Sequence, residues 1–166
     1  AKSLSLDIAT IINITPDHLD YHESFDRYVS SKLKIINFLK TNGIFIYDKS
    51  NKLLNKIIDA NKYNSLKFSS VNEKEAKDFI NDNNYLKGTH NAINASIAIS
   101  IAKKLNINDN KIELAIKRFE GLSHRMEPLY ISSNFKIIND SKSTNGESTA
   151  AALKSFSNIF WIVGGK

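Results

Sequence analysis

Short apolar runs alternate with helical patterns along this chain, and that alternation constrains the fold more than any other feature. The runs DIATIINI (Asp7 to Ile14) and IFIYD (Ile44 to Asp48) are apolar on successive positions, which is typical of strands covered on both faces. Between them, Phe25 to Lys40 has the apolar spacing of an amphipathic helix, and TNG follows as a stop signal. This part of the chain therefore predicts a strand, a helix and a strand.

The second half of the chain continues the alternation. A helix is predicted to begin at Thr89, its N-cap, and another to run from about Asn108 to Phe119. Beyond them, PLYISSNFKIIND predicts strand pairing, STAAALKSF a helix and IFWIVGG a buried strand. A strand, helix and strand with short connections form a βαβ unit, so the predicted fold class is α/β.

Two segments interrupt these patterns. EGLSHRMEP contains Gly121 and Pro128 and is the candidate domain boundary. Residues 49–85 are rich in Lys and Asn and weakly patterned, so the sequence predicts no role for them.

Composition narrows the class of protein. The 166 residues carry a formal net charge of +6 and contain no cysteine, which excludes disulfides and thiolate metal sites. The lysines are spread without a dense run, so we expect no nucleic-acid partner. No apolar run approaches the roughly 20 residues that span a bilayer, and the start lacks the order of a signal peptide. We expect a cytoplasmic protein without a membrane partner.

Lys32 is the first polar anomaly. On the wheel of the predicted helix it falls within an apolar arc, with Tyr28, Ile35, Ile36 and Leu39 around it. A buried ammonium is costly unless it is paired, neutralised or chemically altered. Two interpretations remain open here: a lysine that reaches an edge or a carboxylate, or a functional lysine near an acidic, histidine-bearing loop.

That loop, TPDHLDYHES, carries His18 among acidic residues. It has no Ser or Cys nucleophile in a turn and no HExxH spacing, which disfavours a nucleophile triad and a zinc site. One histidine with carboxylates suits a hard cation better.

Asn91 and Asn94 form the second anomaly. They stand three residues apart and project from the apolar side of the predicted helix. They either cap or bridge to a neighbouring loop, or line a ligand site at the helix N-terminus.

The third anomaly is NDSKSTN, seven residues between a strand and an alanine-rich helix. Open α/β sheets bind ligands beyond the carboxyl ends of their strands. Asp140 offers a carboxylate there and Lys142 a cation, although a solvated turn with Ser148 or Thr149 as helix cap is the plain alternative. In GLSHRMEP, Arg125 is either a surface arginine or a contact for a phosphate or ribose.

Four stretches, in this order, resemble the Mur ligase family: NITPDHLDYHESFDRYVSSKLKI, LKGTHNAINASIAISIAKKL, FEGLSHRME and INDSKSTNGESTAAAL. The NDSKSTN form is most similar to the members that join D-glutamate to UDP-N-acetylmuramoyl-L-alanine in peptidoglycan synthesis. The resemblance implies a ligase that uses ATP and Mg²⁺ to phosphorylate a carboxylate of the nucleotide sugar. The amine of D-glutamate then attacks the acyl phosphate.

The resemblance also implies roles for residues of the first two stretches. Lys32 matches a lysine that the family carbamylates, which converts a cation into an anion that helps to hold magnesium. His18 matches a residue at the metal and phosphate site, and both would be catalytic. Asn91 and Asn94 match positions that contact the adenine nucleotide.

The last two stretches match residues of the C-terminal domain. Arg125 and Asp140 match residues that reach ATP. Lys142 and Thr144 match the surroundings of the D-glutamate carboxylates. Fixed cations are required where an acyl phosphate concentrates negative charge.

The family resemblance implies two domains. Residues 1–121 would be the later part of the P-loop-type central, ATP-binding domain, and residues 122–166 the first part of a Rossmann-like C-terminal domain. No G-x-x-x-x-G-K-[ST] phosphate loop occurs in the chain, although the family carries one upstream. We therefore expect an internal part of a longer parent, completed by the missing parts and without ligase activity alone.

Other functions remain open at this point. A sister amide ligase, such as folylpolyglutamate synthase or another Mur ligase, would differ in the amino acid that stimulates phosphate release. A noncatalytic nucleotide-binding module would bind ATP without turnover. A nucleic-acid binder, motivated only by net charge, would show salt-dependent affinity.

Overall fold

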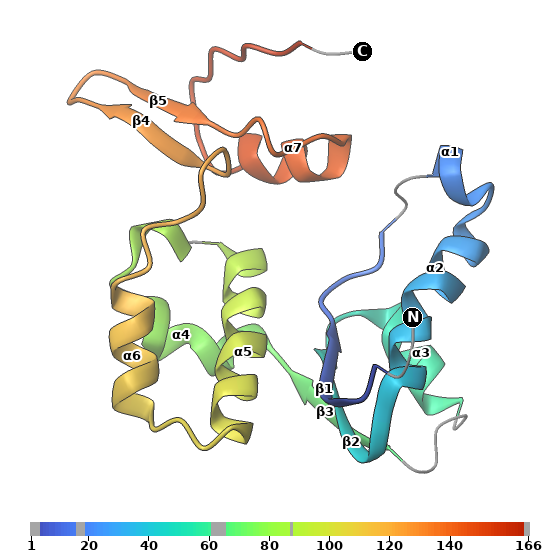
Figure 1. Cartoon of the computed structure of the whole chain (residues 1–166). Helices are drawn as coiled ribbons and strands as arrows, with labels where there is room; N and C mark the ends of the chain where they lie inside the picture. Colours follow the sequence, from blue (N-terminus) through green and yellow to red (C-terminus); the bar gives the residue numbers. More distant parts are fainter. Residues whose placement is uncertain (1–3, 16–18, 61–65, 87, 165–166) are drawn as a thin grey trace. The chain divides into compact units, whose positions relative to one another are not determined.

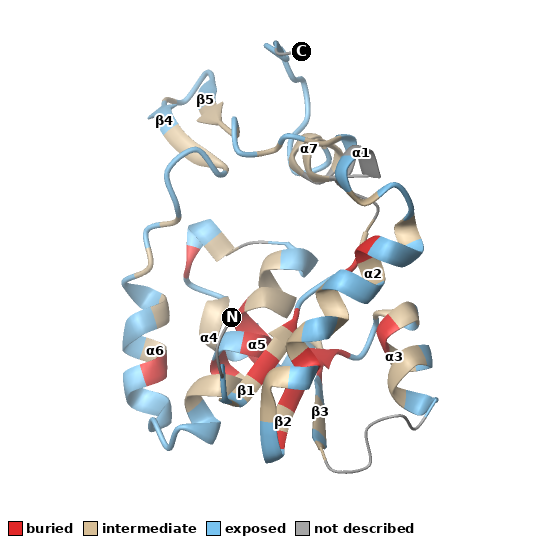
Figure 2. Ribbon diagram, turned by 45° about the vertical axis from the view of Figure 1, so that its right-hand side comes forward, coloured by how far each residue is buried: buried red, intermediate tan, exposed pale blue. Residues whose placement is uncertain are grey.

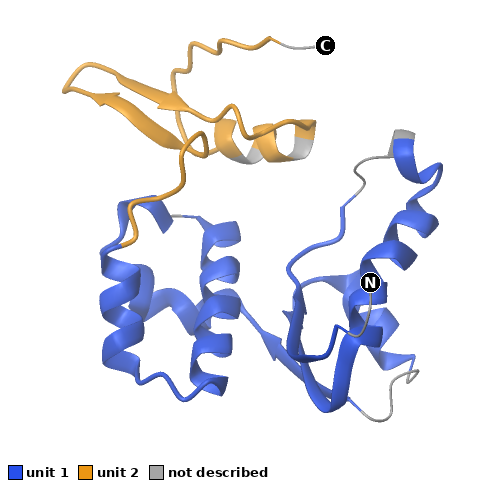
Figure 3. Ribbon diagram, viewed as in Figure 1, with its two compact units in different colours: residues 1–118 blue, residues 119–166 orange. Residues whose placement is uncertain are grey.

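The chain forms two compact units. The computed structural model describes residues 4–15, 19–60, 66–86 and 88–164. Unit 1 comprises residues 1–118 and unit 2 residues 119–166 (Figure 3). Helices and strands occur in both units (Figure 1), so the predicted mixed α/β class is confirmed.

A three-stranded parallel sheet forms the centre of unit 1. Its strands are β1 (Leu6–Ile11), β2 (Leu39–Asp48) and β3 (Lys67–Val71), in the order β1-β2-β3. Successive side chains of β2 point to opposite faces, so Phe45 and Ile46, both fully buried, belong to different apolar clusters. The sheet is therefore covered on both faces, as its apolar runs predict.

Helices cover the two faces of this sheet. On one face, Phe45 packs with Tyr28 of α2, Ile36 of a 3-10 turn and Leu54 of α3. On the other face, Ile97 of α5 packs with Ile46. Figure 2 shows the buried residues gathered in these strands and helices. The bounds are α2 (Phe25–Leu33), the 3-10 turn η1 (Lys34–Phe38), α3 (Lys52–Asp59) and α5 (Thr89–Lys104).

Further short elements complete unit 1 around α5. Ala76, Ala95 and Ile112 form a third apolar cluster, and the side-chain amide of Asn83 donates to the Ile116 carbonyl at 2.6 Å. Across the described ranges, no helix combines the length and the apolar character that a membrane crossing requires. The remaining elements are α1 (Leu19–His22), η2 (Glu73–Ala76), α4 (Lys77–Ile80), η3 (Asn84–Leu86) and α6 (Asp109–Lys117).

The predicted helix from Phe25 to Lys40 is too long. The α-helix ends at Leu33 and a 3-10 turn leads directly into β2. Within β2, Asn42 adopts φ 64° and the pairing with β1 shifts register, so the regular ladder begins at Ile44. The sequence predicted the start of that ladder correctly, because the predicted stop signal TNG contains Asn42, where the strand becomes irregular.

The N-cap of α5 was also predicted wrongly. Gly88, with φ 94°, precedes the helix, and Thr89 is its first residue. A β-branched threonine does not tolerate this left-handed conformation, whereas glycine does. The weakly patterned residues 49–85 contain α3, capped by Asn51, and the third strand of the sheet.

Unit 2 contains an antiparallel hairpin and one helix. The strands are β4 (Glu127–Ile131) and β5 (Lys136–Asn139), which confirms the predicted strand pairing. The helix α7 (Gly146–Leu153) is capped by the side chain of Asn145, which accepts from the Ser148 amide at 2.9 Å. Neither of the predicted caps, Ser148 and Thr149, has that position.

The predicted buried strand IFWIVGG is wrong. Residues 159–164 form no strand, and Phe160 and Ile162 are almost fully exposed. An extended segment becomes a strand only when a neighbour satisfies its backbone groups, and no such ladder is present among the described residues. The βαβ unit predicted for this region is therefore not formed.

Candidate functional site

Lys32 lies in the last turn of α2 and is half-buried. The prediction that it sits within a continuous apolar arc is wrong, because the helix ends one residue later. Ile36 lies in η1 and Leu39 begins β2. Lys32 therefore lies at the carboxyl end of α2, beside the turn η1, and its functional assignment stays a prediction.

The ammonium of Lys32 has two neighbours that favour a cation. Its Nζ lies 4.8 Å from the ring centroid of Tyr28 and donates to the Asn13 carbonyl at 3.5 Å. The face of an aromatic ring attracts a cation through its quadrupole. These contacts hold the amine beside the chain segment that leads into the loop of His18.

Tyr28 is a residue whose role sequence reasoning missed. It is only 5% exposed, and the rings of His22 and Phe25 lie 5.2 and 6.3 Å from it. The signal was available, because an aromatic residue four positions before a lysine lies on the same face of a helix. The buried Tyr28 ring therefore forms one side of the surroundings of the Lys32 amine.

The predicted metal site also includes His18. Pro16, Asp17 and His18 lie outside the described residues. Within the described ranges, no group of three or more metal-ligating side chains occurs. The assignment of His18 and Lys32 to a metal stays a prediction.

Asn91 and Asn94 lie at the start of α5 and are both half-buried. The side-chain amide of Asn91 donates to the Tyr85 carbonyl in η3, at 3.4 Å. Asn91 thus bridges to a neighbouring segment, which was one of the two interpretations left open. Between the two asparagines, Ile93 packs against the sheet cluster.

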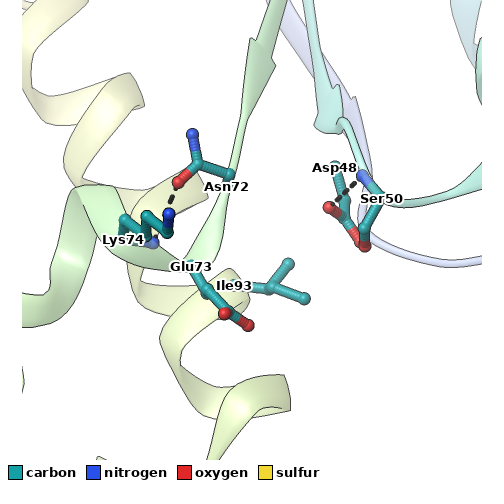
Figure 4. A pocket seen from close by; sticks show the side chains of 6 residues that line it. All are labelled: Asp48, Ser50, Asn72, Glu73, Lys74 and Ile93. Carbon is teal, nitrogen blue, oxygen red and sulfur yellow. Dashed lines mark hydrogen bonds between the residues drawn. The ribbon is translucent and has the colours of Figure 1, made fainter.

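A hollow at the carboxyl ends of β2 and β3 was not predicted. Figure 4 shows the side chains around it, with Asp48 and Ser50 pointing toward one another. Asp48 is 7% exposed, and its two oxygens accept from the Ser50 amide at 2.8 Å and from the Ser50 hydroxyl at 2.6 Å. An aspartate as the last residue of an apolar strand was the available signal. The lining residues are Asp48, Ser50, Asn72, Glu73, Lys74 and Ile93.

In unit 2 the structure brings the two predicted motif loops together. The Lys142 amide donates to the His124 carbonyl at 2.9 Å, and Asp140 Oδ1 accepts from the Met126 amide at 3.0 Å. The segment of Arg125 therefore lies against the segment of Asp140 and Lys142. Two loops that are far apart in the sequence form one polar surface.

Asp140 is the centre of this surface. Its second oxygen, Oδ2, accepts from the Ser143 hydroxyl at 2.5 Å, so both carboxylate oxygens are already hydrogen bonded. Arg125, Lys142 and Thr144 are exposed. The arrangement presents two cations beside a braced carboxylate, which suits an anionic ligand.

The comparison with protein families identifies the family of this chain. The Mur ligase middle domain matches residues 1–108. The chain belongs to the Mur ligase family. The resemblance that the four sequence stretches indicated is thereby confirmed.

Curated Mur ligases match almost the whole chain. The UDP-N-acetylmuramoylalanine--D-glutamate ligase of Novosphingobium aromaticivorans is 34% identical over 99% of the chain. The protein of the same name from Zymomonas mobilis is 36% identical over 98% of it. The chain spans 37% and 36% of the lengths of these two relatives.

A solved Mur ligase shares the fold. The crystal structure of MurF from Acinetobacter baumannii matches 89% of this chain and 36% of its own, with a TM-score of 0.71. Its sequence identity of 20% limits this match to the fold.

Proposed function

We propose that the full-length protein is an ATP-dependent ligase that adds D-glutamate to UDP-N-acetylmuramoyl-L-alanine in peptidoglycan synthesis. The observation that carries this proposal is the 34% identity to a D-glutamate ligase over 99% of the chain. The geometry of unit 2 supports it, because the HRME and NDSKST segments of the motif stretches are hydrogen bonded to each other. An enzyme of this class works on cytoplasmic nucleotide precursors, and we propose that location.

We further propose the finer domain assignment. Residues 1–121 would belong to the P-loop-type central domain and residues 122–166 to a Rossmann-like C-terminal domain. The parallel sheet of unit 1, covered on both faces, is of the kind that central ATP-binding domains use. The match of residues 1–108 to the middle domain supports the first assignment.

Lys32 and His18 are the residues that we propose to hold Mg²⁺. When bound, Mg²⁺ would neutralise the charge that develops on the transferred phosphoryl group. As an ammonium beside the Tyr28 ring and the Asn13 carbonyl, Lys32 fits a Mg²⁺ site poorly, because it offers no lone pair and repels the ion. As a carbamate it would supply the oxygen ligands that Mg²⁺ prefers, and it would have to leave both of those neighbours.

Asn91 and Asn94 are the proposed contacts for the adenine nucleotide. An asparagine side chain offers two donors and an acceptor group, which matches the edge of a base. Asn91 already uses one donor on the Tyr85 carbonyl. That bond orients the Asn91 side chain at the start of α5, where the proposed nucleotide contact lies.

Unit 2 supplies the remaining proposed contacts. Arg125 and Asp140 would bind ATP, and Lys142 and Thr144 would bind the D-glutamate carboxylates. A carboxylate offers about four lone-pair positions, so Asp140 retains acceptors beyond the two it uses on Met126 and Ser143. The side chains of Arg125 and Lys142 are exposed and therefore accessible to an anionic ligand.

The test is amino acid-dependent release of phosphate from ATP by the full-length protein with UDP-N-acetylmuramoyl-L-alanine. We expect D-glutamate to stimulate release, and Lys32→Ala to lose at least about 100-fold in kcat, because removing one charge-stabilising group costs about that much. Lys34→Ala is the matched control, because Lys34 is exposed and starts the adjoining turn.

The outcomes separate the candidate functions. Stimulation by another amino acid would replace the proposal with a sister ligase. ATP binding without turnover, in the presence of every substrate, would replace it with a noncatalytic nucleotide-binding module. Full activity of Lys32→Ala would remove Lys32 from the catalytic residues.

A further inference from the structure

Two side chains outside the proposed contacts join the motif loops of unit 2. Glu127 starts β4 and Asn139 ends β5, opposite one another in the hairpin register. Glu127 Oε2 accepts from the backbone amide of His124 at 2.8 Å and from Asn139 Nδ2 at 3.1 Å. One carboxylate oxygen therefore holds both loops.

Asn139 extends the same network. Its Nδ2 lies 2.9 Å from His124 Nδ1, and its Oδ1 accepts from the Ser141 amide at 3.2 Å. Asn139 thus contacts both the loop that carries Arg125 and the loop that carries Lys142. Every polar group of its side chain is used within unit 2.

The backbone that these bonds hold is not relaxed. His124 and Met126 adopt φ values of 65° and 49°, on either side of Arg125. A left-handed conformation is unfavourable for side chains of this kind, and it persists where surrounding bonds enforce it. Here the amides of His124 and Met126 are held by Glu127 and Asp140, and the His124 carbonyl by the Lys142 amide.

We propose that Glu127 and Asn139 are positioning residues of the proposed ligase. Through His124 and Ser141, they fix the backbone from which Arg125 and Lys142 project, so that the two cations are presented together. The inference rests on the proposed function for its ligands, but the positioning itself is a property of unit 2.

Exchanging the polarity of the pair tests the idea. Glu127→Gln removes the negative charge and one of the two acceptor oxygens, which weakens the bonds to His124 and Asn139, and Asn139→Asp places two carboxylates together. The double variant restores complementarity, since the amide introduced on β4 donates to the carboxylate introduced on β5. Glu120→Gln and Asn134→Asp, both at exposed positions of unit 2, are the matched controls.

Amide hydrogen exchange of the whole chain is the first measurement. We expect each single variant to speed exchange at the Met126 and Lys142 amides by about 10-fold, the effect of losing one charge-assisted hydrogen bond. The double variant should recover most of that protection, and the controls should not change it. Unchanged protection in both single variants, or no recovery in the double variant, would overturn the proposal.

Kinetics of the full-length protein provide the second measurement. We expect each single variant to raise KM for ATP and for D-glutamate together, by about 10-fold, and the double variant to restore both. A purely structural role would lower the amount of active enzyme and leave both KM values unchanged, which would overturn positioning. If the protein lacks D-glutamate-dependent activity, the proposed function fails, and the exchange measurement still decides whether the pair positions the loops.

Discussion

Unit 1 and unit 2 are each stabilised internally by a different kind of interaction. Among the described residues, every buried side chain lies in unit 1, where Phe45, Ile46 and Leu54 are fully buried. Unit 2 instead exposes apolar side chains, such as those of Phe160 and Ile162, and joins its loops by hydrogen bonds of Glu127 and Asn139. Packing holds the strands and helices that carry the site residues of unit 1, and polar contacts hold the loops that carry those of unit 2.

This difference determines what a substitution does. Apolar packing is spread over many contacts, so unit 1 responds to lost volume by losing global stability. A hydrogen bond depends on two atoms and a direction, so unit 2 responds to lost partners by local opening. Mutations should therefore act globally in one unit and locally in the other.

The largest expected effect comes from emptying the core of unit 1. Phe45→Ala should lower the free energy of unfolding by about 3–5 kcal/mol, because a fully buried aromatic side chain leaves a cavity. Urea denaturation followed by circular dichroism gives the value. Phe160→Ala is the control, since Phe160 is 99% exposed, and a comparable loss in that variant would break the contrast between the units.

The buried hydroxyl of Ser96 should have the next largest effect. Ser96 is 1% exposed, and its Oγ donates to the Asn72 carbonyl at 2.7 Å. Ser96→Ala should cost about 1.5 kcal/mol, the upper end for one typical hydrogen bond, because the Asn72 carbonyl would lose one of its two donors and keep the Glu75 amide. The same denaturation experiment measures it, with the exposed Ser30→Ala as control; equal stabilities would show that this bond contributes nothing.

Helix caps allow a matched comparison of the two units. Asn51 caps α3 in unit 1 and Asn145 caps α7 in unit 2, and alanine at either position should cost about 1 kcal/mol. We expect Asn51→Ala to lower the urea midpoint of unit 1, and Asn145→Ala to speed hydrogen exchange only in α7. Slower or faster exchange throughout unit 1 in Asn145→Ala would contradict local opening.

The smallest effect is expected at the exposed pair of Lys117 and Glu113. The Lys117 Nζ lies 2.7 Å from Glu113 Oε1, and the hydrogen bond and charge of Glu113 raise the pKa of Lys117. A raised pKa stabilises the folded state at neutral pH, and this contribution disappears as pH rises through the folded pKa. Glu113→Gln should therefore lower the melting temperature slightly at pH 7 and not at strongly alkaline pH; the opposite pH trend would refute the pairing.

The sequence predicted most of the fold where local pattern and packing agree. The regular ladder at Ile44, the start of α2 at Phe25 and the hairpin of unit 2 followed from periodicity and turn residues. The third strand, β3, was missed, because Lys67 to Val71 has neither a long apolar run nor clear alternation. Its place in the sheet depends on pairing with β2, which a local pattern does not record.

The errors about the site have a related cause. The helical wheel of Lys32 assumed that α2 continues, whereas the backbone tightens into a 3-10 turn after Leu33 to enter β2. Asp140 and Arg125 were singled out separately, and their loops are joined by tertiary hydrogen bonds, such as those of Asp140 to Met126 and of Asn139 to Glu127. Candidate site residues can be predicted one by one from their residue type and local pattern. Their hydrogen-bond partners from distant parts of the chain cannot.

The path of one oxygen atom tests the proposed function most directly. The alanyl carboxylate of UDP-N-acetylmuramoyl-L-alanine would be labelled with heavy oxygen and incubated with the full-length protein, ATP and D-glutamate, and the released phosphate analysed by mass spectrometry. If the carboxylate is phosphorylated and then attacked by the amine, the carbon–oxygen bond breaks and each phosphate carries one labelled oxygen. Phosphate released with D-glutamate but without the label would contradict the acyl-phosphate ligase that this chain is proposed to serve.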